Sequence, residues 1–201
     1  MKKELVLHAY AKVNLVLDVL RKRPDGYHDV RMVMQNVGLF DVLTFTVDEF
    51  AHESDSLSEK QPYRISISAN RGDIPTDGRN LIYKAIALMF ETYHINAAIH
   101  VSLEKHIPVE AGMAGGSTDC AAALHAVNRL FGLGLSEQTL MEIGVKLGAD
   151  VPFCVMGRTA LSEGIGEVLT PVSPLNDCYI LVAKPAVSVS TAMVYGNLRL
   201  D

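Results

Sequence analysis

A glycine-rich segment at residues 108–118 is the part of the sequence whose residue types and spacing best suit chemistry. It reads Pro-Val-Glu-Ala-Gly-Met-Ala-Gly-Gly-Ser-Thr and is followed by an alanine-rich run. Glycine lets a ligand approach the backbone N–H groups closely, and the unpaired N–H groups at the start of a helix favour a phosphate. Ser117 and Thr118 add hydroxyl groups where a phosphate oxygen or a metal ion would bind. The segment matches neither a Walker A loop nor a dinucleotide-binding glycine motif, so a glycine-rich turn capped by Ser117 is an equally good interpretation of it alone.

Two charged residues in apolar surroundings, Lys12 and Asp150, have the side chains of a reacting pair. Lys12 lies in the segment Ala11–Leu15, and Asp150 lies in the segment Gly148–Phe153. If the two meet, the ammonium group would keep the carboxylate ionised as a base and would stabilise charge that develops on a reacting oxygen. Each also has an ordinary structural alternative: a lysine that reaches solvent from an edge strand, and an aspartate that closes a turn after a helix.

The composition limits the class of protein. The 201 residues are 49% hydrophobic and 20% charged, which is typical of a folded globular chain rather than a disordered one. The net charge of −5 argues against a protein that coats nucleic acid, although it leaves room for a local anion site. Cys120, Cys154 and Cys178 are widely spaced, so a reducing compartment is favoured over a disulfide framework or a zinc site. The sequence shows neither a signal peptide nor an apolar run long enough to span a membrane, so we expect a cytoplasmic protein.

Patterns of apolar residues predict the elements that must position these groups. Strands are expected at residues 4–10, 13–20, 63–69 and 98–104, with a further apolar stretch at 37–47. Helices are expected from the cap Asn80 through residue 90, from near Ser117 to Phe131, and from Ser136 to Gly148. An acidic, serine-rich stretch at residues 48–59 is expected to be an exposed loop. Because the elements do not alternate as regular β-α-β units, the pattern predicts an α+β fold.

Several short motifs in a consistent order resemble the GHMP kinase superfamily. They are Ala11–Leu15, Arg23–His28, Ala111–Ala121, Gly148–Phe153 and Glu163–Glu167. The resemblance is strongest to the branch of the superfamily whose substrate carries a cytidine diphosphate group, and it extends over essentially the whole chain. It implies a ribosomal-protein-S5-domain-2-like domain at residues 1–160, which binds ATP and carries the catalytic groups. Residues 161–201 would then be the beginning of a ferredoxin-like C-terminal domain that is incomplete.

The resemblance also implies how ATP is bound and used. Lys12 and Asp150 would be the catalytic pair, with Asp150 accepting the proton of a substrate hydroxyl that attacks the γ-phosphate. Ser117, or Thr118 beside it, would lie near Mg²⁺. The residues implied to bind ATP are Pro108, Gly112, Ala114, Gly115, Gly116, Ser117 and Thr118.

The substrate that the resemblance implies is a small molecule linked to cytidine diphosphate. The residues implied to bind it are Asn14, Tyr27, His28, Thr191 and Tyr195. Tyr27 and Tyr195 would stack on the two sides of the cytosine, and His28 would recognise the polar edge of that base. No nucleic-acid polymer and no membrane is implied as a partner, and the oligomeric state is left open.

The sequence departs from the pattern of the superfamily in ways that keep two alternatives open. Met113 stands where leucine is usual, Thr118 where serine is usual and Cys120 where alanine is usual, all of which are mild changes. Members of the superfamily also continue well beyond the position of Tyr195. The first alternative is another GHMP kinase, acting on homoserine, mevalonate or a sugar, and the second is a nucleotide-binding fragment without catalysis.

Overall fold

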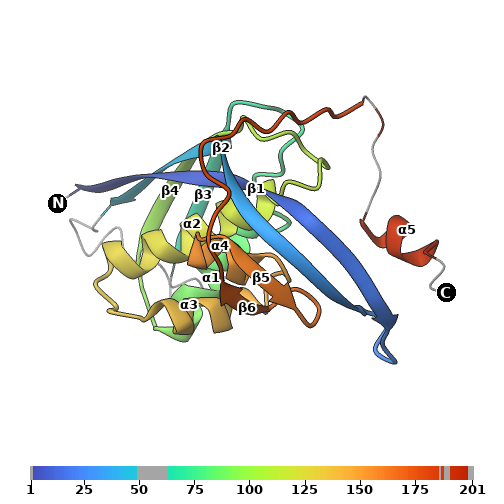
Figure 1. Cartoon of the computed structure of the whole chain (residues 1–201). Helices are drawn as coiled ribbons and strands as arrows, with labels where there is room; N and C mark the ends of the chain where they lie inside the picture. Colours follow the sequence, from blue (N-terminus) through green and yellow to red (C-terminus); the bar gives the residue numbers. More distant parts are fainter. Residues whose placement is uncertain (1, 49–62, 186, 188–190, 199–201) are drawn as a thin grey trace.

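A six-stranded mixed sheet with helices packed against it forms the framework of the protein (Figure 1). The computed structural model describes residues 2–48, 63–185, 187 and 191–198. The strands are β1 (Lys2–Lys22), β2 (His28–Asp48), β3 (Arg64–Ala69), β4 (Ala98–Glu104), β5 (Ala160–Glu163) and β6 (Val168–Pro171). Their order is β3-β4-β2-β5-β6, and β1 pairs with β2 outside this path. Strands β3 and β4 are parallel, and the other pairs are antiparallel.

Only one face of the sheet is covered in the region of β4. Ile99, Val101 and Leu103 are buried, whereas His100 and Ser102 between them are exposed. This alternation arises because successive side chains of a strand point to opposite faces, of which one packs on the helices and the other meets solvent. The strands predicted at residues 63–69 and 98–104 and the predicted α+β fold are confirmed.

The first two strands form a long hairpin, and each contains 21 residues. The prediction of separate strands at residues 4–10 and 13–20 is wrong, because β1 runs without interruption through both ranges. The apparent polar break is a β-bulge, since the register with β2 shifts between Tyr10 and Lys12. A bulge keeps the strand paired but interrupts the alternation of its side chains. In the sequence, this interruption looks like the end of one strand and the start of another. The predicted loop at residues 48–59 lies almost entirely outside the described residues.

Two of the three predicted helices begin at the capping residue that the sequence indicates. They are α1 (Leu81–Thr92), α2 (Gly115–Leu130), α3 (Glu137–Gly144), α4 (Val151–Met156) and α5 (Thr191–Gly196). The Asn80 Oδ1 atom accepts the N–H of Ile82 at 2.8 Å, and the Ser136 Oγ atom accepts the N–H of Thr139 at 3.1 Å. Both predicted N-caps are confirmed.

Two helix boundaries differ from those predicted. Helix α2 begins at Gly115, earlier than the expected Ser117, and its N-cap position is Ala114 in the left-handed region with φ of 56°. Helix α3 ends at Gly144 rather than at Gly148. Leu147 still packs against the core from the turn that follows, so the apolar pattern continues past the end of the helix.

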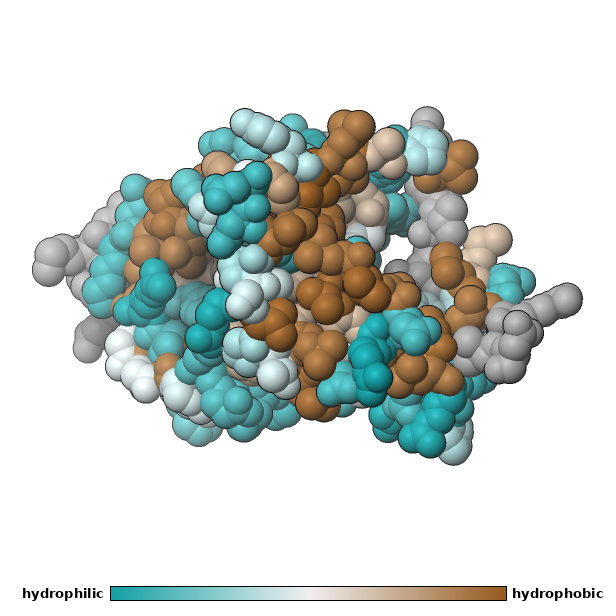
Figure 2. Space-filling model, viewed as in Figure 1, coloured by the Kyte–Doolittle hydropathy of each residue, from teal (hydrophilic) through white to brown (hydrophobic). Residues whose placement is uncertain are grey.

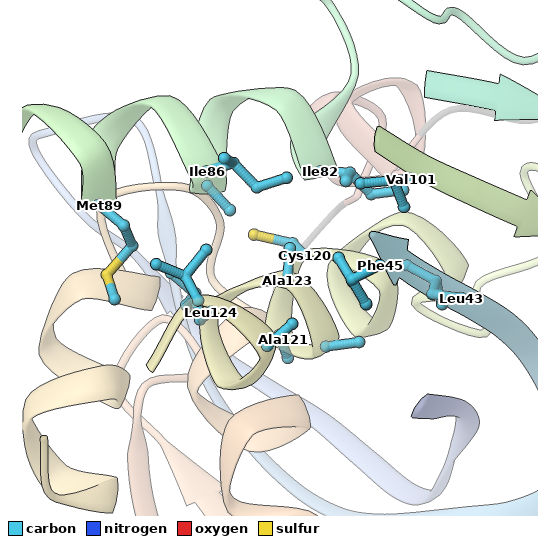
Figure 3. Packing of buried hydrophobic residues seen from close by; sticks show 14 of the residues in the cluster. Leu43, Phe45, Ile82, Ile86, Met89, Val101, Cys120, Ala121, Ala123 and Leu124 are labelled. Carbon is cyan, nitrogen blue, oxygen red and sulfur yellow. The ribbon is translucent and has the colours of Figure 1, made fainter. Parts of the chain in front are cut away.

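The main core lies between α1, α2 and the sheet (Figure 3). Ile82 and Ile86 of α1, Cys120 and Leu124 of α2, and Phe45 of β2 are all fully buried. Burying a large apolar side chain contributes about 1.5–3 kcal/mol relative to leaving it exposed. Packing on several sides therefore fixes α2 firmly, and the position of its N-terminus is fixed with it.

The chain beyond β6 lies on the surface in an extended form as far as residue 185. The Gln35 side chain holds its start, because Nε2 donates to the Leu175 carbonyl at 3.0 Å and Oε1 accepts the Leu175 N–H at 2.7 Å. Figure 2 shows apolar side chains gathered across this face of the molecule. In the chain beyond β6, the side chains of Tyr179 and Leu181 are almost fully exposed. Strands β5 and β6 continue the sheet past residue 160, and the division into domains there stays a prediction. No helix in the described part of the chain is long and apolar enough to cross a membrane.

Replacing Gly144 by alanine should destabilise the contact between α3 and α4. A Cβ atom at this position would lie 2.8 Å from Cγ1 of Val151, a branched side chain that cannot move without disturbing the core. We expect Gly144→Ala to lower the free energy of unfolding by about 1–3 kcal/mol in a urea titration. Gly148→Ala is the matched control, because its Cβ would meet Val151 only at 3.4 Å. Equal effects of the two substitutions would contradict this packing.

Candidate active site

Lys12 is turned into the protein by the bulge in β1. Ala11 and Lys12 are consecutive in the strand, yet both are buried, with exposed fractions of 0% and 4%. The shift in register between Tyr10 and Lys12 makes this possible, because a bulge breaks the strict alternation of side chains. The backbone N–H of Lys12 donates to the carbonyl of Met113 at 3.1 Å. The bulge therefore both directs the lysine inward and ties β1 to the segment before α2.

The Lys12 ammonium group lies between an amide and a carboxylate. Its Nζ atom donates to Oδ1 of Asn14 at 3.0 Å and lies 3.8 Å from Oδ2 of Asp150. Asp150 occupies the N-cap position of α4 but makes no capping hydrogen bond, and about a third of its side chain is exposed. The carboxylate is thus near a positive charge and still accessible, which are the two properties that a general base needs.

The glycine-rich loop, residues 105–114 between β4 and α2, has an unusual backbone. Glu110, Gly112 and Ala114 all have positive φ, at 54°, 69° and 56°. No side chain caps α2, and its first intrahelical bond runs from the Thr118 N–H to the Ala114 carbonyl at 2.9 Å. The N–H groups of the first turn therefore have no side-chain acceptor, and the positive end of the helix dipole is available to an anion. The interpretation of Ser117 as the cap of a simple turn is wrong.

The two hydroxyl groups at the start of α2 have different surroundings. Thr118 is buried, and its Oγ1 donates to the carbonyl of Tyr10 at 2.9 Å. Ser117 is half-buried in the first turn, and Pro108 is half-buried at the other end of the loop. Gly112 and Gly116 are exposed, so a ligand can approach the backbone beside them. The Thr118 hydroxyl group already donates its proton to β1. The Ser117 hydroxyl group is therefore the better placed of the two to bind a ligand.

The aromatic residues come from distant parts of the chain. The rings of His28 and Tyr195 lie 5.1 Å apart at a tilt of 38°. Burial and the charge of Asp150 raise the pKa of Tyr195, and its ring packs against the apolar cluster that contains Phe153 of α4. Tyr27 follows a turn in which its N–H donates to Oδ1 of Asp25 at 3.0 Å, and its side chain is 58% exposed.

The structure brings His28 and Tyr195 together and leaves Tyr27 outside this contact. Among the described residues, Tyr27 makes no ring contact with either of the two. Thr191 begins α5, and its side chain lies outside the described residues. Asn14 is exposed apart from the hydrogen bond that it accepts from Lys12.

A buried group of three charged residues lies beneath the loop, and the sequence reasoning missed it. The Nζ atom of Lys105 lies 2.5 Å from Oδ2 of Asp41 and 2.5 Å from Oδ2 of Asp119. We call these three residues the buried triad. The sequence does indicate it, because Lys105 continues the series of alternate, buried positions that includes Val101 and Leu103. A charged side chain at a position that the strand pattern reserves for apolar ones indicates a buried partner.

The residues that surround the loop fall within a known family. Residues 80–158 match the model of the GHMP kinases N terminal domain, and this range includes the loop, α2 and Asp150. Residues 80–158 of the chain carry a GHMP kinase N-terminal domain. The superfamily proposed from the motifs is thereby confirmed.

Two relatives of high identity carry the same name. The chain is 51% identical over 195 residues to 4-diphosphocytidyl-2-C-methyl-D-erythritol kinase from Lachnoclostridium phytofermentans. It is 47% identical over 195 residues to the protein of the same name from Clostridium botulinum strain Alaska E43. Each alignment covers 97% of this chain but only 63% and 65% of the relatives. The chain therefore spans less than two thirds of the length of the curated relatives that it matches.

Solved structures show the same GHMP kinase fold. A crystal structure of 4-(cytidine 5'-diphospho)-2C-methyl-D-erythritol kinase matches with a TM-score of 0.70 and 31% identity, over 97% of this chain and 65% of that one. Homoserine kinase from Cytophaga hutchinsonii matches with a TM-score of 0.62 and 19% identity, over 85% of this chain and 51% of that one. The second match shows a shared fold and no more.

The buried triad should make stability depend on pH through Asp119. Burial raises the pKa of Asp119 from 3.8 to about 7, although Lys105 acts in the opposite direction. The folded protein then holds this proton more tightly than the unfolded chain does. The contribution of Asp119 to stability is therefore greatest at low pH and falls as the pH rises from about 4 to about 7. Besides Lys105 and Asp41, the thiol of Cys120 interacts with this carboxyl group.

Asp119→Asn removes this titration, because an amide does not ionise. Urea unfolding of both proteins between about pH 4 and about pH 8 gives the difference between their free energies of unfolding. We expect that difference to move in favour of the asparagine variant as the pH rises. A difference that stays constant over the range would show that the Asp119 proton is held equally in the folded and unfolded chains.

Proposed function

We propose that the protein transfers the γ-phosphate of ATP to the 2-hydroxyl of 4-diphosphocytidyl-2-C-methyl-D-erythritol, a step of the non-mevalonate route to isoprenoid precursors. The observation that carries this proposal is the Lys12–Asp150 pair, 3.8 Å apart, in a chain whose relatives bear the name of that kinase. Phosphoryl transfer depends mainly on positioning and on charge stabilisation, for which a lysine, a carboxylate and a phosphate-binding loop are suited.

Asp150 and Lys12 divide the work of the transfer. Asp150 accepts the proton as the substrate hydroxyl oxygen attacks the γ-phosphorus, and the bond to the bridging oxygen breaks to release ADP. Lys12, 3.8 Å from Asp150, stabilises negative charge on the transferring group. The uncapped first turn of α2 binds phosphate oxygens through its N–H groups, and the exposed Gly112 and Gly116 permit the close approach.

The same residues fit a magnesium ion that accompanies ATP. The described residues contain no group of three histidine, cysteine or acidic side chains that would form a complete protein site for a metal. Mg²⁺ needs no such site, because it keeps several waters and takes one or two protein ligands together with substrate phosphates. Ser117 is the residue that we propose as a ligand, and the ion would neutralise charge on the phosphates.

The cytidine part of the substrate would be recognised by the aromatic residues. His28 and Tyr195 already lie in contact, Tyr195 packs against the cluster that contains Phe153 of α4, and Tyr27 adds an exposed ring at the turn before β2. We assign stacking on the base to Tyr27 and Tyr195, recognition of its polar edge to His28, and further substrate contacts to Asn14 and Thr191. An aromatic pair of this kind suits a nucleobase better than it suits homoserine or mevalonate.

Two alternatives have direct tests. A shared fold with homoserine kinase keeps another GHMP kinase activity open, and thermal-shift measurements with CDP, homoserine and mevalonate distinguish the substrates. The short span relative to the curated relatives keeps open a domain that binds nucleotide without turnover. A coupled assay of ADP release, on this chain and on one extended to the relatives' length, decides between catalysis and binding alone.

Asp150→Asn should remove catalysis and leave nucleotide binding in place. The amide has the size of the carboxylate but cannot accept the proton, so we expect turnover to fall by about 10²–10⁴ in the coupled assay. Glu142→Gln, the same chemical change on the exposed side of α3, is the matched control and should keep full turnover. If the affinity for cytidine nucleotides fell together with turnover in Asp150→Asn, the residue would be structural rather than catalytic.

Tyr195→Ala should selectively weaken the binding of the cytidine substrate. Loss of one stacked ring costs about 1–3 kcal/mol, which corresponds to about a 5- to 150-fold weaker affinity for CDP in a calorimetric titration. The affinity for ATP should stay the same. Tyr179→Ala, which removes a fully exposed ring, is the matched control. Equal losses of affinity for CDP and ATP would place Tyr195 outside the cytidine site.

A further inference from the structure

The buried triad connects three segments of the chain around the glycine-rich loop. Asp41 is fully buried on β2, and Lys105 and Asp119 are 7% and 4% exposed. Lys105 is the first residue of the loop, and Asp119 lies in the first turns of α2 just after it. The ammonium group of the first loop residue therefore contacts both β2 of the sheet and the helix that follows the loop.

Asp41 fixes the entrance of the loop to the sheet. Its Oδ1 atom accepts the backbone N–H of His106 at 2.6 Å and that of Ile107 at 2.8 Å, while its Oδ2 atom binds the Lys105 ammonium group. The carboxylate thus uses both oxygens and holds three consecutive residues. Since β2 is the central strand of the sheet, the loop entrance has a rigid support.

Lys105 fixes the exit of the loop through Asp119. The ammonium group lies directly beneath the start of α2, since a Cβ atom placed on Gly115 would be 3.0 Å from Nζ and 3.1 Å from Cγ2 of Ile107. A Cβ atom here would require these neighbours to shift by a few tenths of an ångström, so glycine favours the close approach. The entrance and the exit of the loop are consequently held at one point, and the left-handed residues between them are confined to a closed segment.

The composition of the triad argues against a purely stabilising role. One lysine faces two carboxylates, and Oδ1 of Asp119 is buried without any hydrogen-bond partner in the described structure. A buried ion pair is weak evidence for stability, because desolvation offsets the attraction between the charges. A second carboxylate with an unpartnered oxygen adds to that cost, so its retention needs a geometric reason.

We propose that Lys105, held by Asp41 and Asp119, is a positioning residue that keeps the glycine-rich loop and the first turn of α2 in the conformation that receives a nucleotide phosphate. It touches no reacting atom and acts through the backbone of residues 106–116. The inference rests on the proposed function for the identity of the ligand, but the conformation of the loop can be tested without any ligand.

The first test is the isosteric variant Asp119→Asn, which replaces a charged contact to Lys105 by a weaker neutral one. Hydrogen exchange is measured on the free parent and on the free variant at the same pH. We expect the amides of residues 112–118 to exchange faster in the variant, with the core strands unchanged. Unchanged exchange in this segment would overturn the proposal. Asp177→Asn, which removes an exposed negative charge at a left-handed position that asparagine tolerates, is the matched control.

The second test uses the sign of the change in ATP affinity. If Asp119 acted only through its negative charge, Asp119→Asn would bind the anionic nucleotide more tightly. A positioning role predicts the opposite, with affinity lower by about ten-fold because the N–H groups of the loop are less well ordered. Tighter or unchanged binding would overturn the proposal.

Lys105→Met provides a stronger version of the same test. It leaves two buried carboxylates without a cation, so melting followed by circular dichroism first establishes the range in which it is folded. Within that range, we expect ATP affinity to fall further than in Asp119→Asn, whereas parental affinity in a destabilised protein would show that the triad only stabilises the fold. If Lys105→Met does not fold, the Asp119→Asn results decide. A parent that binds no ATP would contradict the proposed function, and the exchange measurements would still decide the positioning role.

Discussion

The first turn of α2 must leave its backbone N–H groups unpaired while the remainder of the helix is buried. A serine or aspartate at the N-cap would satisfy these groups within the helix, and it would also compete with any ligand for them. The protein instead has Ala114 there, in a left-handed conformation that disfavours a residue with a Cβ atom. The site therefore needs supports outside the helix that hold the first turn in place.

Three contacts supply these supports, and two of them come from β1. The N–H of Lys12 binds the Met113 carbonyl, and the Tyr10 carbonyl accepts the Thr118 hydroxyl. The same short piece of strand thus holds the residues on both sides of the helix start and carries the Lys12 ammonium group. The distance between this charge and the N–H groups of α2 is set by two hydrogen bonds across a bulge. The buried triad adds the third contact, through β2.

Local signals account for the parts of the fold that the sequence predicted correctly. Asn80 and Ser136 cap their helices through their own side chains, and alternation along β4 reports burial on one face, so neighbouring residues contain all the information. The bulge before Lys12 is different, because it depends on the register with β2 and appears in the sequence as a break. The start of α2 was misplaced for a related reason: Ser117 is a good cap by type, but the contacts that fix the helix start are made with β1 and the triad.

For the site residues too, the sequence identifies the residue types but does not show which of them lie together. The Lys12 and Asp150 motifs are recognisable by their residues, but nothing local shows that they lie 3.8 Å apart or that His28 meets Tyr195. The triad also has a local signal, since Asp41 and Lys105 both occupy buried positions of strand patterns. A charged residue at a buried position of a strand indicates a buried partner of opposite charge, because burial of an unpaired charge is prohibitively costly.

The two buried lysines near the loop have opposite relations to a ligand. Lys105 is enclosed by two carboxylates at 2.5 Å, so its charge is already compensated and none of its contacts is open to solvent-borne phosphate. Lys12 lies 3.8 Å from a single carboxylate that is one third exposed, a separation longer than a hydrogen bond. An arriving anion can therefore share the charge of Lys12 without first breaking an ion pair. Lys105 is thus suited to hold the loop, and Lys12 is suited to bind the ligand of the loop. The difference arises because Lys105 contacts two carboxylates and Lys12 lies near one.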